Sequence, residues 1–397
     1  MKILLINEEC GTGSTGRICT DIATALEARG DEVKIAYGRN VDIVPECFQK
    51  YAVRIGNDID LKLHGAKTRL LDATGFGSIR ATRKFIHWVK EYNPDVIHLH
   101  NLHGYYINIE ILFEYLKNCG KKILWTLHDV WAFTGHSAYC DAVQCEKWKT
   151  KCNRCPQMRT YPKSYIDRSE HNWLKKKNIF TGVDNLTIIT PSRWLEGLVR
   201  DSFLKGYPTQ VIQNGIDINR FCKVESSLKS NLNLDGKKIL LSVATIWNDL
   251  KGFSDFIELS KILDNTFQII LVGGMEEKLE KKLPDKITHI QKTQNIDEMV
   301  ELYNIADIYV NLTYCDTYPT VNLEAVACGT PVLTYAVGGS TESAEEYGGI
   351  SVEKGNIIEV ARNVNDFQKN SLNTIDRKKM DKQLTAEKYI KLYERLE

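Results

Sequence analysis

The stretch CDTYPTVNLEAVACGTPV, residues 315–332, decides the fold of this 397-residue chain. It follows an apolar run at 308–312 that is typical of a buried strand. Two acids, Asp316 and Glu324, stand eight positions apart in it. We expect the second acid to open a helix of small residues that Gly329 ends and Pro331 keeps from resuming. A strand, a turn and a helix N-terminus together favour an anion, and carboxylates beside them can accept hydrogen bonds from sugar or ribose hydroxyls.

Apolar strands alternate with helical segments on both sides of this stretch. The chain is too long for one ordinary core, so two domains are expected. Strands separated by helices form parallel, doubly wound sheets. The predicted fold class is therefore α/β, with two Rossmann-like domains facing a central cleft. We expect the first domain at 1–215, the second at 216–375, and a C-terminal helix at 376–397 that packs back onto the first.

Composition and charge exclude some classes of protein. No apolar run approaches the roughly 20 residues that span a bilayer, and the N-terminus predicts a short strand rather than a secretion signal. A cytoplasmic protein is expected. Residues 1–207 carry 30 basic and 23 acidic side chains, and residues 208–397 carry 22 and 28. The basic half could face anionic lipid headgroups or a phosphorylated acceptor, or the difference could be ordinary variation of surface charge.

Several candidate ligand-binding residues follow predicted strands, where the ligands of a doubly wound sheet bind. Lys251 could neutralise a diphosphate, and the pair Gly273 and Gly274 would let a base or ribose lie against the backbone. Gly13 and Gly16 belong to a loop that opens the first helix, but their spacing is not the dinucleotide fingerprint. His128 could position a hydroxyl or exchange a proton near neutral pH. Each of these residues could equally serve only the fold.

Four of the eleven cysteines cluster just after His128. In a reducing compartment such a cluster favours tetrahedral structural zinc, with free thiols and disulfides as the alternatives. Zinc would stiffen the loop and would leave no open coordination position for a substrate. The expected ligands are Cys140, Cys145, Cys152 and Cys155.

The order of these motifs resembles that of family-4 retaining glycosyltransferases, which have the GT-B fold, over nearly the full chain. The matching pieces are GSTGR at 13–17, HLHN at 98–101, LHD at 127–129, PSRWL at 191–195, NGID at 214–217, KG at 251–252, VGG at 272–274 and LEAVACGTPV at 323–332. The chain looks most similar to members that assemble bacterial exopolysaccharide, capsule or O-antigen.

This resemblance implies a hexose-type transfer from a nucleotide diphosphate sugar, UDP favoured over GDP, to a saccharide or polyprenyl-diphosphate-linked acceptor. It implies retention of the anomeric configuration, no catalytic metal or other required cofactor, and a place in the cytoplasm with peripheral contact at the inner membrane face. The implied catalytic residues are His128, Lys251, Asp316 and Glu324. The implied donor-binding residues are Gly13, Gly16, Arg17, Arg193, Asn214, Gly273, Gly274, Thr317, Tyr318, Thr320, Val321, Asn322 and Glu324.

Two departures from the family pattern concern donor binding. The first acid is Asp316 where the family usually has Glu, and no arginine stands between Val243 and Lys251. The charge of the diphosphate must then be met elsewhere, for which Arg17 and Arg193 are candidates. A sugar-nucleotide epimerase on the same architecture, or a non-catalytic subunit that binds the nucleotide sugar, are the alternative functions.

Overall fold

The computed structural model describes residues 1–40, 43–366 and 375–395. It divides the chain into two compact units, one of Met1–Gln213 with Thr385–Glu397 and one of Asn214–Leu384. The first boundary therefore falls two residues before the expected one. In the described part of the chain, no helix combines the length and the apolar character needed to cross a bilayer.

The first unit is built on a seven-stranded parallel sheet with the order β3-β2-β1-β4-β5-β6-β7. Its strands are β1 (Lys2–Ile6), β2 (Glu32–Tyr37), β3 (Ala52–Arg54), β4 (Val96–Leu99), β5 (Lys122–Thr126), β6 (Leu186–Thr190) and β7 (Thr209–Val211). Its helices are α1 (Gly13–Ala28), α2 (Asp58–Leu71), α3 (Ile79–Tyr92), α4 (Ile109–Asn118), α5 (Ser169–Phe180), α6 (Arg193–Asp201) and most of α14 (Lys382–Arg395).

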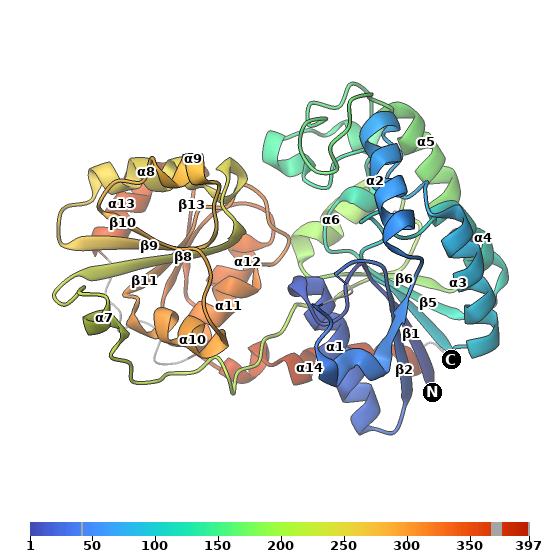
Figure 1. The fold of residues 1–397 in the computed structure, drawn as a ribbon, viewed down its shortest axis with the longest axis horizontal. Helices are drawn as coiled ribbons and strands as arrows, with labels where there is room; N and C mark the ends of the chain where they lie inside the picture. Colours follow the sequence, from blue (N-terminus) through green and yellow to red (C-terminus); the bar gives the residue numbers. More distant parts are fainter. Residues whose placement is uncertain (41–42, 367–374, 396–397) are drawn as a thin grey trace. The chain divides into compact units, whose positions relative to one another are not determined.

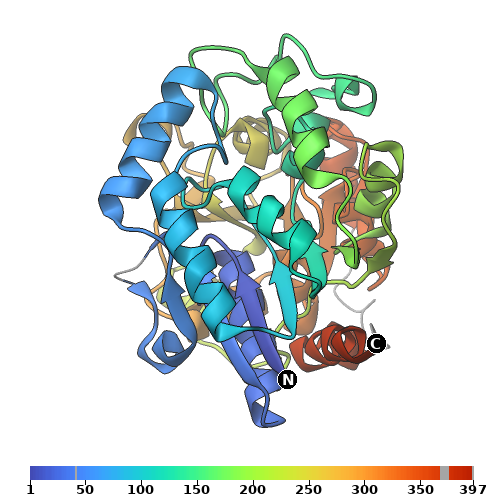
Figure 2. The same cartoon turned by 90° about the vertical axis from the view of Figure 1, so that its right-hand side faces the viewer.

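Alternate residues of the strands supply the cores on the two faces of this sheet. Leu4 and Ile6 of β1 pack with α3 and α4, whereas Ile3 and Leu5 pack with α1 and α14. Figure 2 shows α14, in red, close to the N-terminal strand in blue. Both faces are covered, which explains why the strands read as continuous apolar runs.

The C-terminal helix is tied to the sheet by buried polar contacts. The Tyr393 hydroxyl lies 2.7 Å from Nδ1 of His98 on β4, and the Thr126 hydroxyl donates to Tyr389 over 3.4 Å. The helix predicted over 376–397 is shorter in the structure, because Asp381 is extended between a short 3-10 helix and α14. Residues 396–397 of that prediction lie outside the described residues.

The second unit has a six-stranded parallel sheet with the order β10-β9-β8-β11-β12-β13. Its strands are β8 (Lys238–Ile246), β9 (Phe267–Gly274), β10 (Ile287–Ile290), β11 (Ile308–Asn311), β12 (Val332–Tyr335) and β13 (Ile350–Val352). Its helices are α7 (Leu228–Asn231), α8 (Phe253–Ile262), α9 (Glu277–Glu280), α10 (Ile296–Ile305), α11 (Thr320–Ala327), α12 (Ser340–Glu345) and α13 (Ile357–Asp366). Helices α8 and α13 cover one face, and α10, α11 and α12 cover the other.

The two ends of the second unit lie side by side. Ile216 pairs with Asp381 in an isolated parallel bridge, and its backbone N–H donates to the Met380 carbonyl over 2.8 Å. The Ile216 carbonyl accepts in turn from the backbone N–H of Lys382, whose ammonium lies 3.0 Å from the Asp217 carboxylate. The two ends of the second unit are therefore joined to each other by hydrogen bonds.

Candidate active site

The polar residues of the second unit gather where β8 and β11, neighbours in the sheet, end. The loop after β11 carries Asp316, and the loop after β8 carries Lys251 on a short 3-10 helix, Asp249–Lys251. The two loops are joined by a backbone hydrogen bond of 2.8 Å from Tyr314 to Leu250. This edge, at the carboxyl ends of the strands, is where ligands of doubly wound sheets bind.

Lys251 and Asp316 form an ion pair at this edge. The Lys251 ammonium lies 3.2 Å from Oδ2 of Asp316 and 3.4 Å from the Thr313 hydroxyl. Both charged side chains are partly exposed, so the pair itself adds little stability. It places a cation and an acceptor next to one another at a surface that a ligand can reach.

Glu324 is held by a tyrosine from another helix. Its Oε2 accepts a 2.9 Å hydrogen bond from the hydroxyl of Tyr303 on α10, and Tyr303 is fully buried. Because the hydroxyl fixes one carboxylate oxygen, the orientation of the partly buried carboxylate is set before a ligand arrives. Sequence reasoning missed Tyr303, since nothing in the pattern of α10 distinguishes a site tyrosine from a core tyrosine.

The expected opening of the helix at Glu324 is wrong. Helix α11 begins at Thr320, with Pro319 as its N-cap at φ −69°. Proline is well suited to the start of a helix because its φ is already helical and it needs no hydrogen-bond partner. Glu324 therefore lies in the second turn, and Thr320 and Val321 occupy the first turn, where both are partly buried.

Other predicted donor-binding residues have structural partners. Asn322 is buried and bonds both Asn311 of β11, over 3.0 Å, and Ser343 of α12, over 2.9 Å. The side chain of Tyr318 is buried in the core, and its carbonyl accepts from Asn214 over 3.2 Å. Thr317 is partly buried in the same loop. Asn322 and Tyr318 thus stabilise, through buried contacts, the segment that joins β11 to α11.

Glycines let backbone segments approach one another closely at this edge. Gly273 has φ +127°, and a Cβ there would overlap the Ala244 carbonyl oxygen of the neighbouring strand. Gly338 has φ +53°, and a Cβ there would overlap the carbonyl oxygen of Asp316. The next residue, Gly339, donates its N–H to that same carbonyl over 3.0 Å. Gly338 therefore holds the Asp316 loop in place, a role that the sequence alone did not assign.

In the first unit, a chain of histidines ends at His128. Nδ1 of His100 lies 3.0 Å from Nε2 of His128, and the two rings are stacked. One nitrogen must donate and the other accept, so the tautomers of the two rings are coupled. Burial lowers the pKa of His128 to about 4 and, with a smaller effect from His128, that of His98 to about 3. His128 is therefore neutral at physiological pH and can act as a hydrogen-bonding group. The expected proton exchange near neutral pH is wrong, because burial places the pKa too low for it.

A second histidine pairs with the acid beside His128. Nε2 of His103 lies 2.6 Å from Oδ2 of Asp129, and Nδ1 lies 3.0 Å from the Tyr161 hydroxyl. Burial alone would lower the pKa of His103, but the Asp129 carboxylate raises it above its ordinary value. The same pair leaves the pKa of Asp129 below its usual value despite burial.

The structure places the remaining predicted residues in the first unit. Gly13 and Gly16 lie in the first turn of α1, Arg17 begins its second turn, and Arg193 opens α6. Gly13 has φ +62°, and Gly16 is buried against the backbone of Glu9 and Gly11.

None of the four predicted zinc ligands, all within the described residues, forms a disulfide. Burial raises the pKa of both Cys152 and Cys155 to about 11, and the Cys152 sulfur accepts from the Gly135 N–H over 3.3 Å. Within the described ranges, no group of three or more His, Cys, Asp or Glu side chains is placed to hold a metal ion. The backbone N–H of Cys145 donates to the carbonyl of Cys140 over 3.0 Å. Zinc stays a prediction of the sequence.

Comparison with known families matches both units. Residues 15–220 match the family model described as Glycosyltransferase Family 4, and residues 224–387 match the model described as Glycosyl transferases group 1. Together the two models span most of the chain, and the first alone covers about half of it.

Curated relatives include two bacterial enzymes. The chain is 25% identical to WcaC of Escherichia coli (strain K12), named as a colanic acid biosynthesis glycosyl transferase, over 74% of this chain and 72% of that protein. It is 29% identical to the N,N'-diacetylbacillosaminyl-diphospho-undecaprenol alpha-1,3-N-acetylgalactosaminyltransferase of Campylobacter jejuni, over 46% of this chain and 53% of that protein.

Solved structures share the fold. Sucrose-phosphate synthase from Thermosynechococcus elongatus superposes with a TM-score of 0.75 at 19% identity, covering 100% of this chain and 98% of that one. Anabaena HepE in complex with UDP and glucose gives a TM-score of 0.70 at 15% identity, covering 100% of both chains. These likenesses show the fold, which is the two-domain Rossmann-like architecture known as GT-B.

Proposed function

Because the chain belongs to Glycosyltransferase Family 4, we propose that it transfers a hexose-type sugar from a nucleotide diphosphate sugar to a saccharide or lipid-linked saccharide acceptor. We favour UDP over GDP as the carrier and synthesis of a cell-surface polysaccharide as the pathway class. The observation that carries the proposal is the Lys251–Asp316 ion pair at the ends of β8 and β11, followed along the chain by the Tyr303-held Glu324 of α11. Similar proteins include one solved in complex with UDP and glucose and one named for a diphospho-undecaprenol-linked substrate, which supports the choice of substrates.

Each residue has a proposed task in donor binding. Glu324 accepts hydrogen bonds from the two ribose hydroxyls, since one of its oxygens is already fixed by Tyr303. Lys251 neutralises the diphosphate, and Asp316 accepts from hydroxyls of the transferred sugar. The glycines at 273 and 274 leave room for the nucleotide against the end of β9.

The proposed reaction retains the anomeric configuration. The bond between the anomeric carbon and the diphosphate oxygen breaks, and the acceptor oxygen bonds the same face of the sugar. The acceptor proton passes to the departing diphosphate oxygen, so that no protein nucleophile is needed. Lys251 stabilises the charge that develops on this oxygen, which makes the step independent of a metal. The neutral imidazole of His128 orients a hydroxyl of the transferred sugar or the acceptor.

The first test is a thermal-shift panel of UDP-, GDP- and ADP-sugars with the bare nucleotides. A ligand that binds only the folded state raises the melting temperature by mass action. We expect one nucleotide series to stabilise the protein and Glu324→Ala to abolish that shift. Transfer with the matching donor should then give a product of unchanged anomeric configuration by NMR. If no nucleotide sugar stabilises the protein, the proposal fails.

A further inference from the structure

A cavity of about 620 Å³ lies in the first unit, and the residues that line it are not among those proposed for donor binding. It has the size of a small-ligand site. It is lined by residues of α2, of the loop after β4 and of the segment 159–163. Those that carry the argument are Arg69, Tyr105, Arg159, Tyr161 and Lys163.

Three basic side chains line the cavity, whereas Glu8, the acid whose charge acts on both Tyr105 and Tyr161, is itself paired with Arg39. Among the described residues, no carboxylate forms an ion pair with Arg69, Arg159 or Lys163; Arg69 only lies over the Tyr165 ring, 5.7 Å from its centre. Three basic side chains around one hollow favour an anionic ligand, and arginine is particularly suited to phosphate because its donors form a fork.

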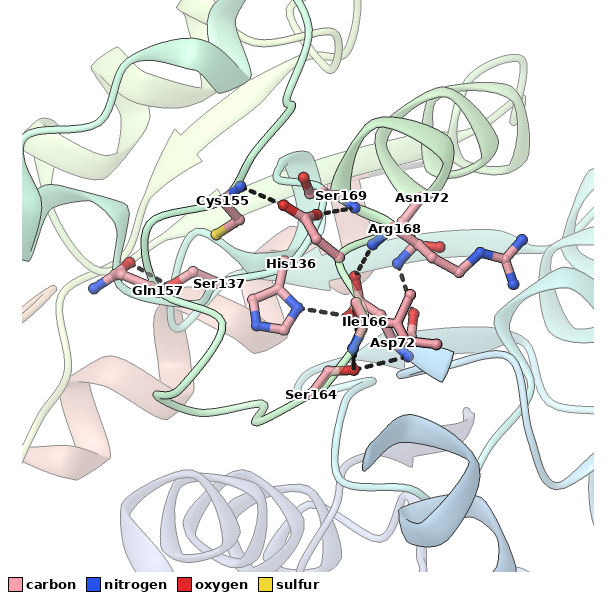
Figure 3. A network of polar contacts seen from close by, with 12 residues as sticks. Asp72, His136, Ser137, Cys155, Gln157, Ser164, Ile166, Arg168, Ser169 and Asn172 are labelled. Carbon is pink, nitrogen blue, oxygen red and sulfur yellow. Dashed lines mark hydrogen bonds and ion pairs between the residues drawn. The ribbon is translucent and has the colours of Figure 1, made fainter. Parts of the chain in front are cut away.

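A buried polar network fixes the segments that carry these cations (Figure 3). The Ser164 hydroxyl donates to the Arg69 carbonyl over 3.2 Å and accepts from the Asp72 N–H over 3.0 Å. The Asp72 carboxylate is fully buried, contacts His136 over 2.5 Å and accepts from the Arg168 N–H over 3.1 Å. The end of α2 and the segment before α5 are thereby held together. The backbone positions of Arg69 and Lys163 are consequently fixed, which lowers the entropic cost of binding.

The tyrosines of the cavity are also positioned in advance. Tyr105 has φ +71°, a strained conformation for a residue with a side chain, and its carbonyl accepts from Ser78 over 3.1 Å. The Tyr161 hydroxyl contacts His103, which pairs with Asp129 beside His128. The cavity is therefore linked by direct contacts to the candidate acceptor residues of the same unit.

An apolar stripe on α2 leads to the cavity. Ile59, Leu63, Ala66 and Leu70 recur at helical spacing on one face, and Ala66 lines the cavity. Ile59 is 68% exposed and Leu63 65%, and Tyr165 beside the cavity is 76% exposed. Apolar side chains this exposed, next to unpaired cations, match a molecule that is both anionic and lipidic.

We propose that this cavity binds the diphosphate group of a lipid-linked acceptor, with the lipid chain along the apolar stripe of α2. Arg69, Arg159 and Lys163 contact the phosphates, and Tyr105 and Tyr161 contact the first sugar. This inference rests on the proposed function for its biological meaning, but the binding it describes does not require turnover.

The test measures binding of farnesyl diphosphate, inorganic pyrophosphate and farnesol to the full chain by calorimetry. The charge variant combines Arg69→Gln, Arg159→Gln and Lys163→Gln. Its matched control combines Arg83→Gln, Lys90→Gln and Lys205→Gln, which removes three exposed charges from the same unit. A stripe variant combines Ile59→Gln and Leu63→Gln. Circular dichroism and melting temperature establish that each variant is folded.

We expect farnesyl diphosphate to bind more tightly than the other two probes. The charge variant should weaken its binding at least about tenfold while the control does not. The stripe variant should weaken farnesyl diphosphate but not pyrophosphate. Equal binding by the charge variant and its control overturns the proposal. If pyrophosphate binds as tightly as farnesyl diphosphate, the site serves a free phosphate compound and the lipid assignment is wrong.

The nucleotide panel on the same variants separates this inference from the proposed function. The charge variant should keep the stabilisation by nucleotide sugar that Glu324→Ala loses. If the unmodified protein binds no nucleotide, the proposed function fails. Binding of farnesyl diphosphate would still support the lipid diphosphate site in that case.

Discussion

The hydroxyl of Tyr303 on α10 donates a 2.9 Å hydrogen bond to the carboxylate of Glu324 on α11. The tyrosine has no access to solvent, so it cannot exchange this partner for water without moving the helix. The carboxylate proposed to hold the ribose is therefore oriented by the core of the second unit.

Tyr303→Phe should weaken nucleotide binding about tenfold, because a lost hydrogen bond to a charged group is worth about 1.4 kcal/mol or more. Tyr335→Phe is the matched control, since it also removes a tyrosine bond to a carboxylate, the 2.8 Å contact with Asp255. Calorimetric titration with the nucleotide identified in the panel measures both. Equal effects from the two variants would mean that Tyr303 acts through stability alone.

Lys251→Met should lower kcat by about a hundredfold or more, because the charge developing on the leaving diphosphate loses its counter-charge. Lys251→Arg should recover part of the rate. Lys261→Met, at an exposed position of α8, is the control and should have no effect. Steady-state kinetics with the matching donor separate the effect on kcat from that on KM. An unchanged kcat in Lys251→Met would remove this lysine from the mechanism.

Gly273→Ala should destabilise the second unit and abolish nucleotide binding, because the new Cβ would overlap the Ala244 carbonyl of the adjacent strand. Gly236→Ala supplies the comparison. Gly236 also has a positive φ of +77° but has open space where a Cβ would lie, so only the backbone strain of about 1–2 kcal/mol applies. Urea unfolding measures the difference, and comparable losses of stability would contradict the steric argument.

The buried histidines make the first unit sensitive to acid. The unfolded chain binds protons at these rings near pH 6.5, whereas the folded chain does so only near pH 4 at His128 and near pH 3 at His98. The free energy of unfolding should therefore fall as the pH is lowered from about 6.5 to 4. His103 opposes this trend, since its raised pKa gives a stabilisation that is present below pH 6.5 and lost as the pH rises through the folded pKa.

Urea denaturation between pH 4 and 7 measures this slope. His98→Gln should reduce it, whereas His87→Gln, at an exposed position of α3, should leave it as it is. A slope that is the same in His98→Gln and in the unmodified protein would show that the acid sensitivity has another origin.

Metal analysis of the purified protein tests the cysteine cluster. The sequence predicts one zinc per chain, lost when Cys152→Ser and Cys155→Ser are combined, whereas Cys47→Ser, an exposed thiol elsewhere, keeps it. Metal-free protein with reactive thiols at these positions would refute the prediction. The loop would then be held without a metal, by the Asp72 network and by core packing such as that of Trp148.

The sequence predicted those elements whose apolar period is clear. Strand β11 (Ile308–Asn311) lies within the apolar run at 308–312 that predicted it. Helix α2 was not predicted, because apolar residues such as Leu63 remain exposed and blur the pattern that burial produces.

The site was predictable only where its residues follow strands in the sequence. The proximity of Lys251 to Asp316 follows from the parallel neighbours β8 and β11, whose carboxyl ends share one edge. Tyr303 could not be predicted in this way, because its contact with Glu324 depends on how two helices pack. The role of Gly338 could not be predicted for the same reason. It depends on close contact with the carbonyl of Asp316, which lies 22 residues earlier in the chain.

The paired ends of the second unit have a consequence for how the chain can be rearranged. Ile216 bridges to Asp381, so the two ends of the segment 214–384 lie next to each other. The chain therefore leaves the first unit and returns to it through adjacent residues. Such a segment needs little extra loop-closure entropy when it is moved to another host or joined end to end. The second unit could thus be exchanged as a single block, with the first unit and its C-terminal helix left intact.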